Sequence, residues 1–167
     1  MRSTSLVPVE EYLSTDYSPD VDYVDGVIEE RNVGERPHSF VQRRLILSLS
    51  SYPGLHVWPE QRVQVQGTRW RVPDICVTLS DPKTDTFTSP PFLCIEILSS
   101  EDTMNRTVRK LQDYQDFGVP HIWLFDPWNR KTCTYSSSGL VEAGSGLLTT
   151  VDPAIAIDAV KLFEALA

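Results

Sequence analysis

Hydrophobic and polar residues alternate along this chain in short segments that predict many strands and a few helices. Period-two alternation and continuous apolar runs of strand length mark the strands, and apolar residues at helical spacing mark the helices. The predicted strands are a hairpin within residues 21–32, two strands over 55–67 and 69–79, two buried strands at 92–99 and 121–127, and an outer strand at 131–137. The predicted helices cover residues 7–14, 38–52, 102–117 and 158–166.

The order of these elements predicts the fold class. Residues 92–127 form a strand, a helix and a strand, so the two strands are expected to be parallel, with a right-handed crossover. We find no internal repeat and no linker that would divide the 167 residues. The sequence therefore predicts a single domain over residues 1–167, an α/β fold with a mixed sheet and helices on its faces.

Composition narrows the class of protein. The formal net charge of −8 argues against a broad basic surface for nucleic-acid phosphates, although a local basic groove remains compatible with it. No apolar run approaches the ~20 residues of a membrane span, and the N-terminal segment is a poor signal peptide. Three widely spaced cysteines, two of them in apolar strands, indicate a reducing compartment. We therefore expect a cytoplasmic protein with no membrane partner.

Two carboxylates stand inside apolar strand segments, where burial of a charge is costly. Asp74 lies in "RVPDICV" at residues 71–77, and Glu96 lies in "FLCIEILSS" at residues 92–100. Side chains alternate across a sheet, so if the strands are neighbours the two acids can lie side by side. Two adjacent carboxylates repel unless a cation lies between them, and oxygen ligands suit Mg²⁺ or Mn²⁺.

A lysine on the following helix falls on the same side. At 100° per residue, Met104, Val108 and Leu111 form the core stripe of helix 102–117, and Lys110 lies near it rather than facing solvent. Its ammonium group can therefore reach past the end of the Glu96 strand. In that position it could hold or deprotonate a nucleophilic water and offset charge in a phosphoryl transition state.

Each of these residues also has an ordinary structural explanation. Asp74 beside a proline can cap a turn, Glu96 can pair with Arg69 or Arg71, and the stem of Lys110 can cover apolar surface while its head reaches water. Two acids in the middle of apolar strands, together with the lysine, favour the metal site.

A further acid and a basic cluster complete the candidates. Asp22 can be another metal ligand, directly or through water, or part of a solvated face, whereas Asp25 is explained by its Asp-Gly turn. Arg36, Arg43 and Arg44 are the densest basic cluster and can contact phosphate. His38 either caps the start of its helix or contacts substrate.

The residues quoted above resemble one known family. "VDYVDGVI" at 21–28, "VPD" at 72–74, "IEILSSED" at 95–102, Lys110, Tyr114 and "FGVPHIWLFDP" at 117–127 are similar to the Uma-two family, described as putative restriction endonucleases, of the PD-(D/E)xK nuclease superfamily. The resemblance covers residues 8–136. It implies a restriction-endonuclease-like fold, a mixed β-sheet flanked by α-helices.

The resemblance also implies roles for particular residues. Asp74 and Glu96 match the motif acids, and Lys110 matches a lysine that has moved to the helix from the motif position, which Leu98 occupies here. Asp22 matches the family's early acid and His38 a histidine that opens the second helix. Two residues depart from the family pattern: Ser100 replaces a proline, and Arg106 replaces an acid.

The function expected from these residues is metal-dependent hydrolysis of DNA. Asp74, Glu96 and the backbone carbonyl of Ile97 would hold Mg²⁺ or Mn²⁺, with Lys110 as the catalytic cation. His38, Arg43, Arg44 and Arg106 are candidate substrate-binding residues. A homodimer would suit cleavage of both strands. The alternative is a non-catalytic member of the same fold that binds metal or a partner protein in a defence or mobile-element system.

Overall fold

The computed structural model describes residues 5–32 and 34–167. Residues 1–4 and residue 33 lie outside the described chain. Residues 1–4 begin the N-terminal segment that the sequence analysis found to be a poor signal peptide. The helices are α1 (Val9–Ser14), α2 (Arg36–Ser50), α3 (Met104–Phe117) and α4 (Ala159–Glu164). The first strands are β1 (Asp22–Val24), β2 (Val27–Glu29), β3 (His56–Pro59), β4 (Val63–Gln66), β5 (Arg69–Arg71) and β6 (Ile75–Thr78). The remaining strands are β7 (Leu93–Ile97), β8 (His121–Asp126), β9 (Lys131–Ser136), β10 (Gly139–Glu142), β11 (Leu147–Thr149) and β12 (Ala156–Asp158).

The largest sheet has six strands in the order β10-β9-β8-β7-β6-β3. Within it, β7 and β8 pair in parallel, as the strand-helix-strand pattern predicts, and the other pairs are antiparallel. Two smaller sheets have the orders β2-β1-β5-β4 and β11-β12. The expected α/β class with a mixed sheet is confirmed.

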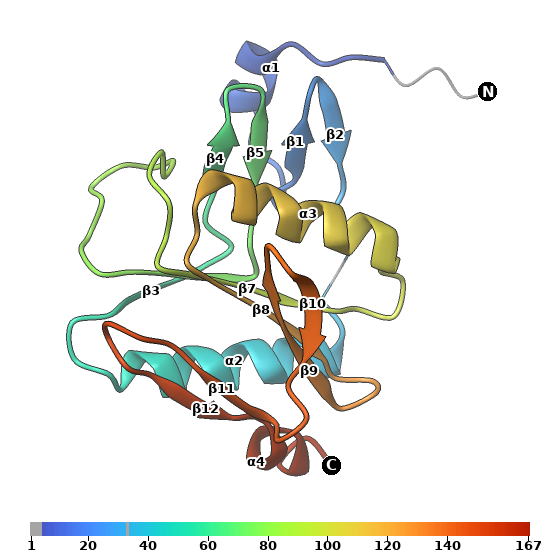
Figure 1. The fold of residues 1–167 in the computed structure, drawn as a ribbon. Helices are drawn as coiled ribbons and strands as arrows, with labels where there is room; N and C mark the ends of the chain where they lie inside the picture. Colours follow the sequence, from blue (N-terminus) through green and yellow to red (C-terminus); the bar gives the residue numbers. More distant parts are fainter. Residues whose placement is uncertain (1–4, 33) are drawn as a thin grey trace.

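Helices cover both faces of the six-stranded sheet, as Figure 1 shows. On one face, α2 and α4 pack against a core that includes Leu45, Ile95 and Phe163. On the other face, α3 packs through Leu111 and Tyr114 against a second core that contains Cys76 and Cys94. The four-stranded sheet lies beyond α3 and packs with α1 around Tyr12, forming a third core.

Two of the predicted strands are each broken in two, and this break shapes the site. Residues 55–67 divide into β3 and β4, and residues 69–79 divide into β5 and β6, so each segment passes from one sheet to another. Glu60 has a left-handed φ of 52° at the first break. Pro73, which has no N–H for a sheet ladder, stands at the second. Asp74 therefore lies just before β6, where the two sheets diverge.

Other differences lie in weakly patterned segments. Strands β10, β11 and β12 were not predicted, because the apolar residues of 138–158 come in runs of at most four, separated by Gly, Ser, Thr and acidic residues. Met104, predicted to belong to the core stripe of its helix, is 49% exposed, since it stands at the first residue of α3, beyond the sheet. The Asp25-Gly26 turn was predicted correctly, and both residues have positive φ.

Candidate active site

The two strand carboxylates lie opposite each other on neighbouring strands. β6 pairs with β7 so that Ile75 faces Ile95. Asp74 precedes Ile75 and Glu96 follows Ile95, so the antiparallel register brings the two acids together at the end of the strand pair. Both are buried, with 5% of Asp74 and 8% of Glu96 exposed. The register thus places the two acids side by side, as the sequence analysis predicts.

Asp74 is held by donors from three elements. Its Oδ1 accepts a hydrogen bond from Nη2 of Arg31 at 2.7 Å and lies 3.2 Å from Nε2 of His38, while its Oδ2 accepts from the Ile97 backbone N–H at 2.7 Å. Burial raises the pKa of Asp74, but the hydrogen bond from His38 and the charges of His38, Arg31 and Lys110 outweigh it and hold the pKa well below its usual range. Asp74 is therefore a firmly ionised carboxylate.

Glu96 has a different environment. Its Oε1 accepts a hydrogen bond from the Tyr114 hydroxyl at 2.5 Å and lies 3.1 Å from Nζ of Lys110. Burial, together with the nearby charge of Asp74, outweighs the attraction of Lys110 and raises the pKa of Glu96 to about 7. The positive charge around Glu96 thus offsets only part of the cost of burying its carboxylate.

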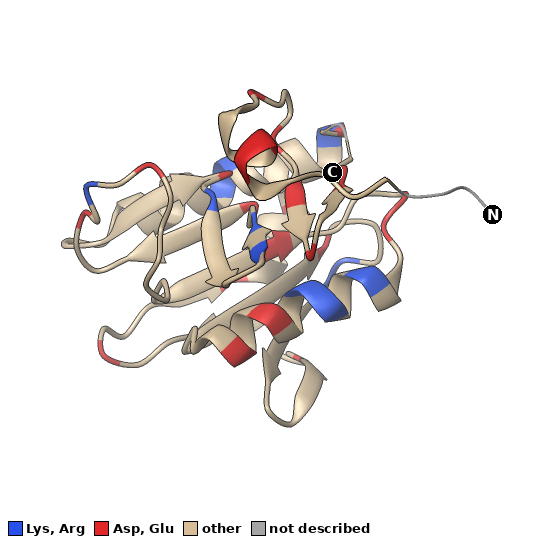
Figure 2. Ribbon diagram, turned by 90° about the horizontal axis from the view of Figure 1, so that it is seen from above, with Lys and Arg blue, Asp and Glu red and all other residues tan. Residues whose placement is uncertain are grey.

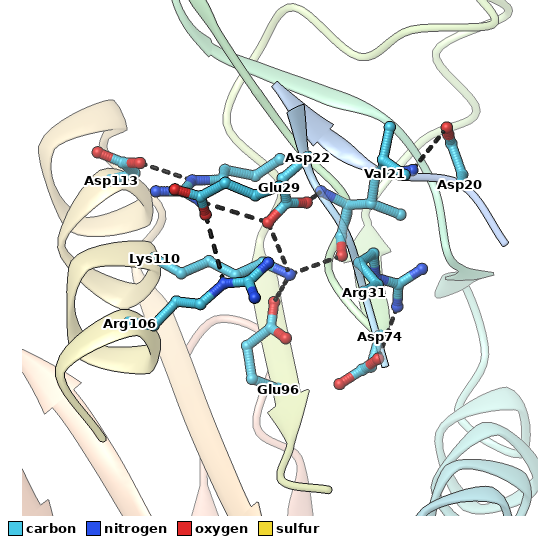
Figure 3. A network of polar contacts seen from close by, with 12 residues as sticks. Asp20, Val21, Asp22, Glu29, Arg31, Asp74, Glu96, Arg106, Lys110 and Asp113 are labelled. Carbon is cyan, nitrogen blue, oxygen red and sulfur yellow. Dashed lines mark hydrogen bonds and ion pairs between the residues drawn. The ribbon is translucent and has the colours of Figure 1, made fainter. Parts of the chain in front are cut away.

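Lys110 reaches the two strands from α3, as Figure 3 shows. Its Nζ donates to the Val72 carbonyl at 2.9 Å and lies 3.3 Å from Oδ2 of Asp22. Burial lowers the pKa of Lys110, but the charges of Asp22 and Glu96 prevail and raise it above its usual value. Lys110 is therefore a charged ammonium whose side chain is only 12% exposed, as the helical wheel predicts.

Asp22 supports this arrangement from β1. Its Oδ1 accepts the Val72 backbone N–H at 2.7 Å, and its Oδ2 is shared by Lys110 and Nη1 of Arg71, each at 3.3 Å. Both oxygens are thus engaged by protein donors, and Asp22 positions Lys110. Its predicted role as a metal ligand stays a prediction.

A buried ion-pair network joins this part of the site to α3. Nε of Arg71 donates to Oδ2 of Asp113 at 2.7 Å, and its Nη1 lies 3.0 Å from Oε2 of Glu29. Arg69 binds the other oxygen of Asp113 at 2.8 Å. Arg69 and Arg71 therefore pair with acids of the helix and the first hairpin, and not with Glu96 as the ordinary explanation above would require.

One cavity of about 150 Å³ is lined by Asp22, Arg71, Asp74, Glu96 and Lys110, among other residues. Its charged lining has six acids and four strong bases. The acids are Asp22, Glu30, Glu60, Asp74, Glu96 and Asp102, and the bases are Arg31, Arg71, Arg106 and Lys110. The acids of the lining thus outnumber its strong bases, and His38 adds a positive charge when it is protonated.

The donor set fits a hard divalent cation. In the described residues, no group of three or more His, Cys, Asp or Glu side chains is arranged as a metal cluster. Mg²⁺, however, is commonly held by one or two carboxylates and several waters. Asp74 and Glu96 supply two carboxylates, and both protein donors to Glu96 reach the same oxygen, Oε1. The backbone of Ile97 also lines the cavity. A Zn²⁺ site is usually built mainly from His and Cys ligands, and His38 is the one histidine among the residues that line this cavity.

The candidate substrate-binding residues divide into two groups. His38 and Arg106 line the cavity. Arg106 lies 3.5 Å from Glu29 and donates to the Glu30 carbonyl, so it joins α3 to the end of the first hairpin. Arg43 and Arg44 are exposed on α2, outside the cavity lining. Leu98, at the motif lysine position, also lines the cavity, while Lys110 supplies the amine beside Glu96.

The sequence analysis missed Arg31 and Gln42. Gln42 donates to the Asp74 carbonyl at 3.0 Å, and Arg31 reaches Asp74 from the segment after β2. Gln42 could have been found from its position one helical turn after His38, on the same face of α2. No sequence pattern distinguishes Arg31, because its contact with Asp74 spans 43 residues.

Comparisons with known proteins bear on the family and the fold of the chain. The family model of Uma2, described as "Putative restriction endonuclease", matches residues 9–156. A solved structure described as a putative nuclease belonging to DUF820 from Anabaena variabilis ATCC 29413 is similar in fold, with a TM-score of 0.82 and 20% sequence identity. The match covers 96% of this chain and 99% of that chain. None of the curated proteins compared matches the chain.

Proposed function

The chain belongs to the Uma2 family, and from this membership and the paired acids beside Lys110 we propose that it is a metal-dependent endonuclease that hydrolyses DNA phosphodiester bonds. Family and fold both support a nuclease. The observation that carries the proposal is the meeting of Asp74, Glu96 and Lys110 in one cavity whose acids outnumber its strong bases.

Asp74 and Glu96 would hold Mg²⁺ or Mn²⁺, with the Ile97 carbonyl and waters completing the coordination. A bound cation would polarise the scissile phosphate and lower the pKa of an attacking water. The protein donors around the two acids fix their positions: Arg31 and the Ile97 N–H orient Asp74, and Tyr114 orients Glu96. The two carboxylates themselves thus need little rearrangement when a cation binds.

Lys110 would provide the positive charge next to the reacting atoms. Its ammonium group has three donors, one of which already binds the Val72 carbonyl. Within reach of Glu96, it can hold the attacking water for displacement in line with the leaving oxygen, and it can offset the charge that develops on the phosphoryl oxygens. Asp22 keeps Lys110 charged and aimed at the cavity.

One observation favours a second candidate function. Both oxygens of Asp74 are engaged by protein donors, and Arg106 stands where the family commonly has an acid. A non-catalytic member that binds metal or a partner protein would have such a site. Metal binding without cleavage of DNA or RNA would favour this candidate.

The test uses cleavage of plasmid and linear DNA in Mg²⁺ or Mn²⁺. Asp74→Asn and Lys110→Gln are each expected to reduce the rate by about 10² or more, because each removes a charge at the reacting centre. Glu142→Gln, an exposed change on β10, is the matched control and should cleave like wild type. Melting temperatures would show whether the variants are folded. If folded Asp74→Asn and Lys110→Gln cleave at the wild-type rate, the proposed mechanism is wrong.

A further inference from the structure

Arg31 occupies the place at Asp74 where a cation would bind. Its Nη2 lies 2.7 Å from Oδ1 of Asp74, and its side chain is only 10% exposed. A divalent cation on the same oxygen would stand close to the positive charge of the guanidinium group, and the two charges repel. The protein itself therefore neutralises the acid that the proposed function assigns to the metal.

The second nitrogen of the same guanidinium group lacks a hydrogen-bond partner. Nη1 of Arg31 is buried and makes no hydrogen bond to any of the described residues, and its ion-pair contact with Glu60 is long, at 3.8 Å. A buried N–H without an acceptor is costly, and native structures seldom retain one without a reason. Arg31 lines the cavity, so an acceptor for Nη1 can be a ligand there.

The backbone on both sides of Arg31 is fixed across the cavity mouth. Arg106 of α3 donates to the Glu30 carbonyl. Nδ2 of Asn32 donates to Oγ of Ser99 at 2.7 Å and to Oδ1 of Asp102 at 2.9 Å. Since residues 30 and 32 are anchored to α3 and to the segment after β7, the side chain of Arg31 can change partner while its backbone keeps its place.

We propose that Arg31 exchanges partners during the reaction cycle: it occupies Asp74 in the free protein, yields that oxygen to the divalent cation, and then binds a phosphate of the nucleic-acid substrate. The inference rests on the proposed function and adds to it a substrate-phosphate contact and a competition at the metal site.

The chemistry of the two partners supports this exchange. A guanidinium group presents parallel N–H donors whose spacing matches two oxygens of a phosphate, whereas in the free protein one of these donors is unused. His38 and the Ile97 N–H still contact Asp74 when Arg31 leaves, so the carboxylate stays in place. A phosphate entering the cavity brings the negative charge that Arg31 needs after it loses Asp74.

The experiment first measures Mn²⁺ affinity by calorimetry, without nucleic acid. Arg31→Gln is expected to bind Mn²⁺ about tenfold more tightly than wild type, because a competing charge-assisted hydrogen bond is removed. A purely structural role for Arg31 would weaken the site instead. Arg62→Gln is the matched control, since Arg62 is a partly buried arginine that pairs with Asp20 outside the cavity lining, and its Mn²⁺ affinity should equal that of wild type.

The second measurement is binding of a short DNA duplex in Ca²⁺, used here as a non-cleaving ion. Arg31→Gln should bind the duplex about tenfold more weakly. Arg31→Lys keeps a positive charge beside Asp74 but lacks the two parallel N–H donors of a guanidinium group. It should therefore bind Mn²⁺ like wild type and the duplex more weakly. This variant decides the matter if Arg31→Gln does not fold.

The outcomes separate this inference from the proposed function. If wild type and Arg31→Gln bind Mn²⁺ equally, or if the duplex affinity of both Arg31 variants is unchanged, the exchange is refuted and the metal-dependent nuclease stands. If neither wild type nor Arg31→Gln binds Mn²⁺, both are refuted. If only Arg31→Gln binds Mn²⁺, the competition at Asp74 is supported in its strongest form.

Discussion

At the scale of single residues, Glu96 links the chemistry of the site to the stability of the fold. Its pKa of about 7 in the folded protein lies above the value of about 4.3 in an unfolded chain. The folded state therefore binds the proton more tightly. The stabilisation is fully present below about pH 4.3 and is lost as the pH rises through about 7.

We therefore expect the metal-free protein to lose stability between pH 5 and 8 through Glu96. The loss should be about 3 kcal/mol, since each pKa unit corresponds to about 1.4 kcal/mol. Urea unfolding of wild type and Glu96→Gln in EDTA would measure this component as the difference between the two pH profiles. Other titrating groups contribute to both proteins, so parallel profiles would contradict the prediction.

At the scale of elements, the charged residues of α3 are arranged unfavourably with respect to the helix dipole. Arg106, Arg109 and Lys110 lie in its N-terminal half, and Asp113 and Asp116 in its C-terminal half, a separation visible in Figure 2. A helix favours acids near its N-terminus and bases near its C-terminus. Tertiary ion pairs offset this cost, because Asp113 binds Arg69 and Arg71, and Lys110 binds Asp22 and Glu96. The same pairs bring the basic half of α3 to the cavity.

The pair of Arg71 and Asp113 should accordingly be important for stability. Arg71→Met is expected to lower the free energy of unfolding by about 3–5 kcal/mol, because it removes from Asp22, Glu29 and Asp113 the buried cation that they share. Lys131→Met is the matched control. It breaks an ion pair with Glu142 whose side chains are more than half exposed, so its cost should stay below about 1 kcal/mol. Urea unfolding of both variants would compare them, and equal costs would contradict the prediction.

Much of the element pattern could be predicted from the sequence, and the exceptions have physical causes. Strands β7 and β8 and helix α3 have continuous or periodic apolar residues, so the parallel unit was correctly predicted. The sequence analysis did not predict that residues 69–79 pass from one sheet to another. The pattern of apolar residues in a strand is the same whether the strand belongs to one sheet or is divided between two. Register could not be deduced until β6 and β7 were known to pair, although the proximity of Asp74 and Glu96 depends on it.

The site shows the same division between local and long-range information. Lys110 was placed correctly, because helical periodicity is local. Arg31 escaped prediction, because it reaches Asp74 from a segment after β2 that carries no apolar pattern. Residues that act through long-range contacts from irregular segments are therefore found only in the folded structure.

At the scale of the whole molecule, the net charge of −8 limits how the chain can hold a nucleic acid. None of the described helices has the length and apolar character required to cross a membrane. Acidic and basic residues are interspersed along much of the ribbon in Figure 2. Phosphate contacts should thus come from a few arginines in or beside the cavity. Those residues are Arg31, Arg43, Arg44 and Arg106.

The salt dependence of DNA binding would count these contacts. Each neutralised phosphate contributes about −0.9 to the slope of log K against log salt concentration, so four contacts predict a slope of about −4. Arg43 and Arg44 are exposed on α2, whose residues His38 and Gln42 line the cavity, and the structure records no ion pair for either arginine within residues 5–32 and 34–167. The double variant Arg43→Gln/Arg44→Gln should therefore reduce the slope to about −2.

Fluorescence anisotropy of a labelled duplex in Ca²⁺ at several salt concentrations would measure both slopes. Lys83→Gln is the control, because Lys83 is exposed on the loop between β6 and β7, outside the cavity lining, and its slope should equal that of wild type. Mn²⁺ affinity should be the same in the double variant as in wild type, since neither arginine lines the cavity. An unchanged slope in the double variant would mean that Arg43 and Arg44 of α2 do not contact the DNA backbone, and that the phosphate contacts come from the cavity alone.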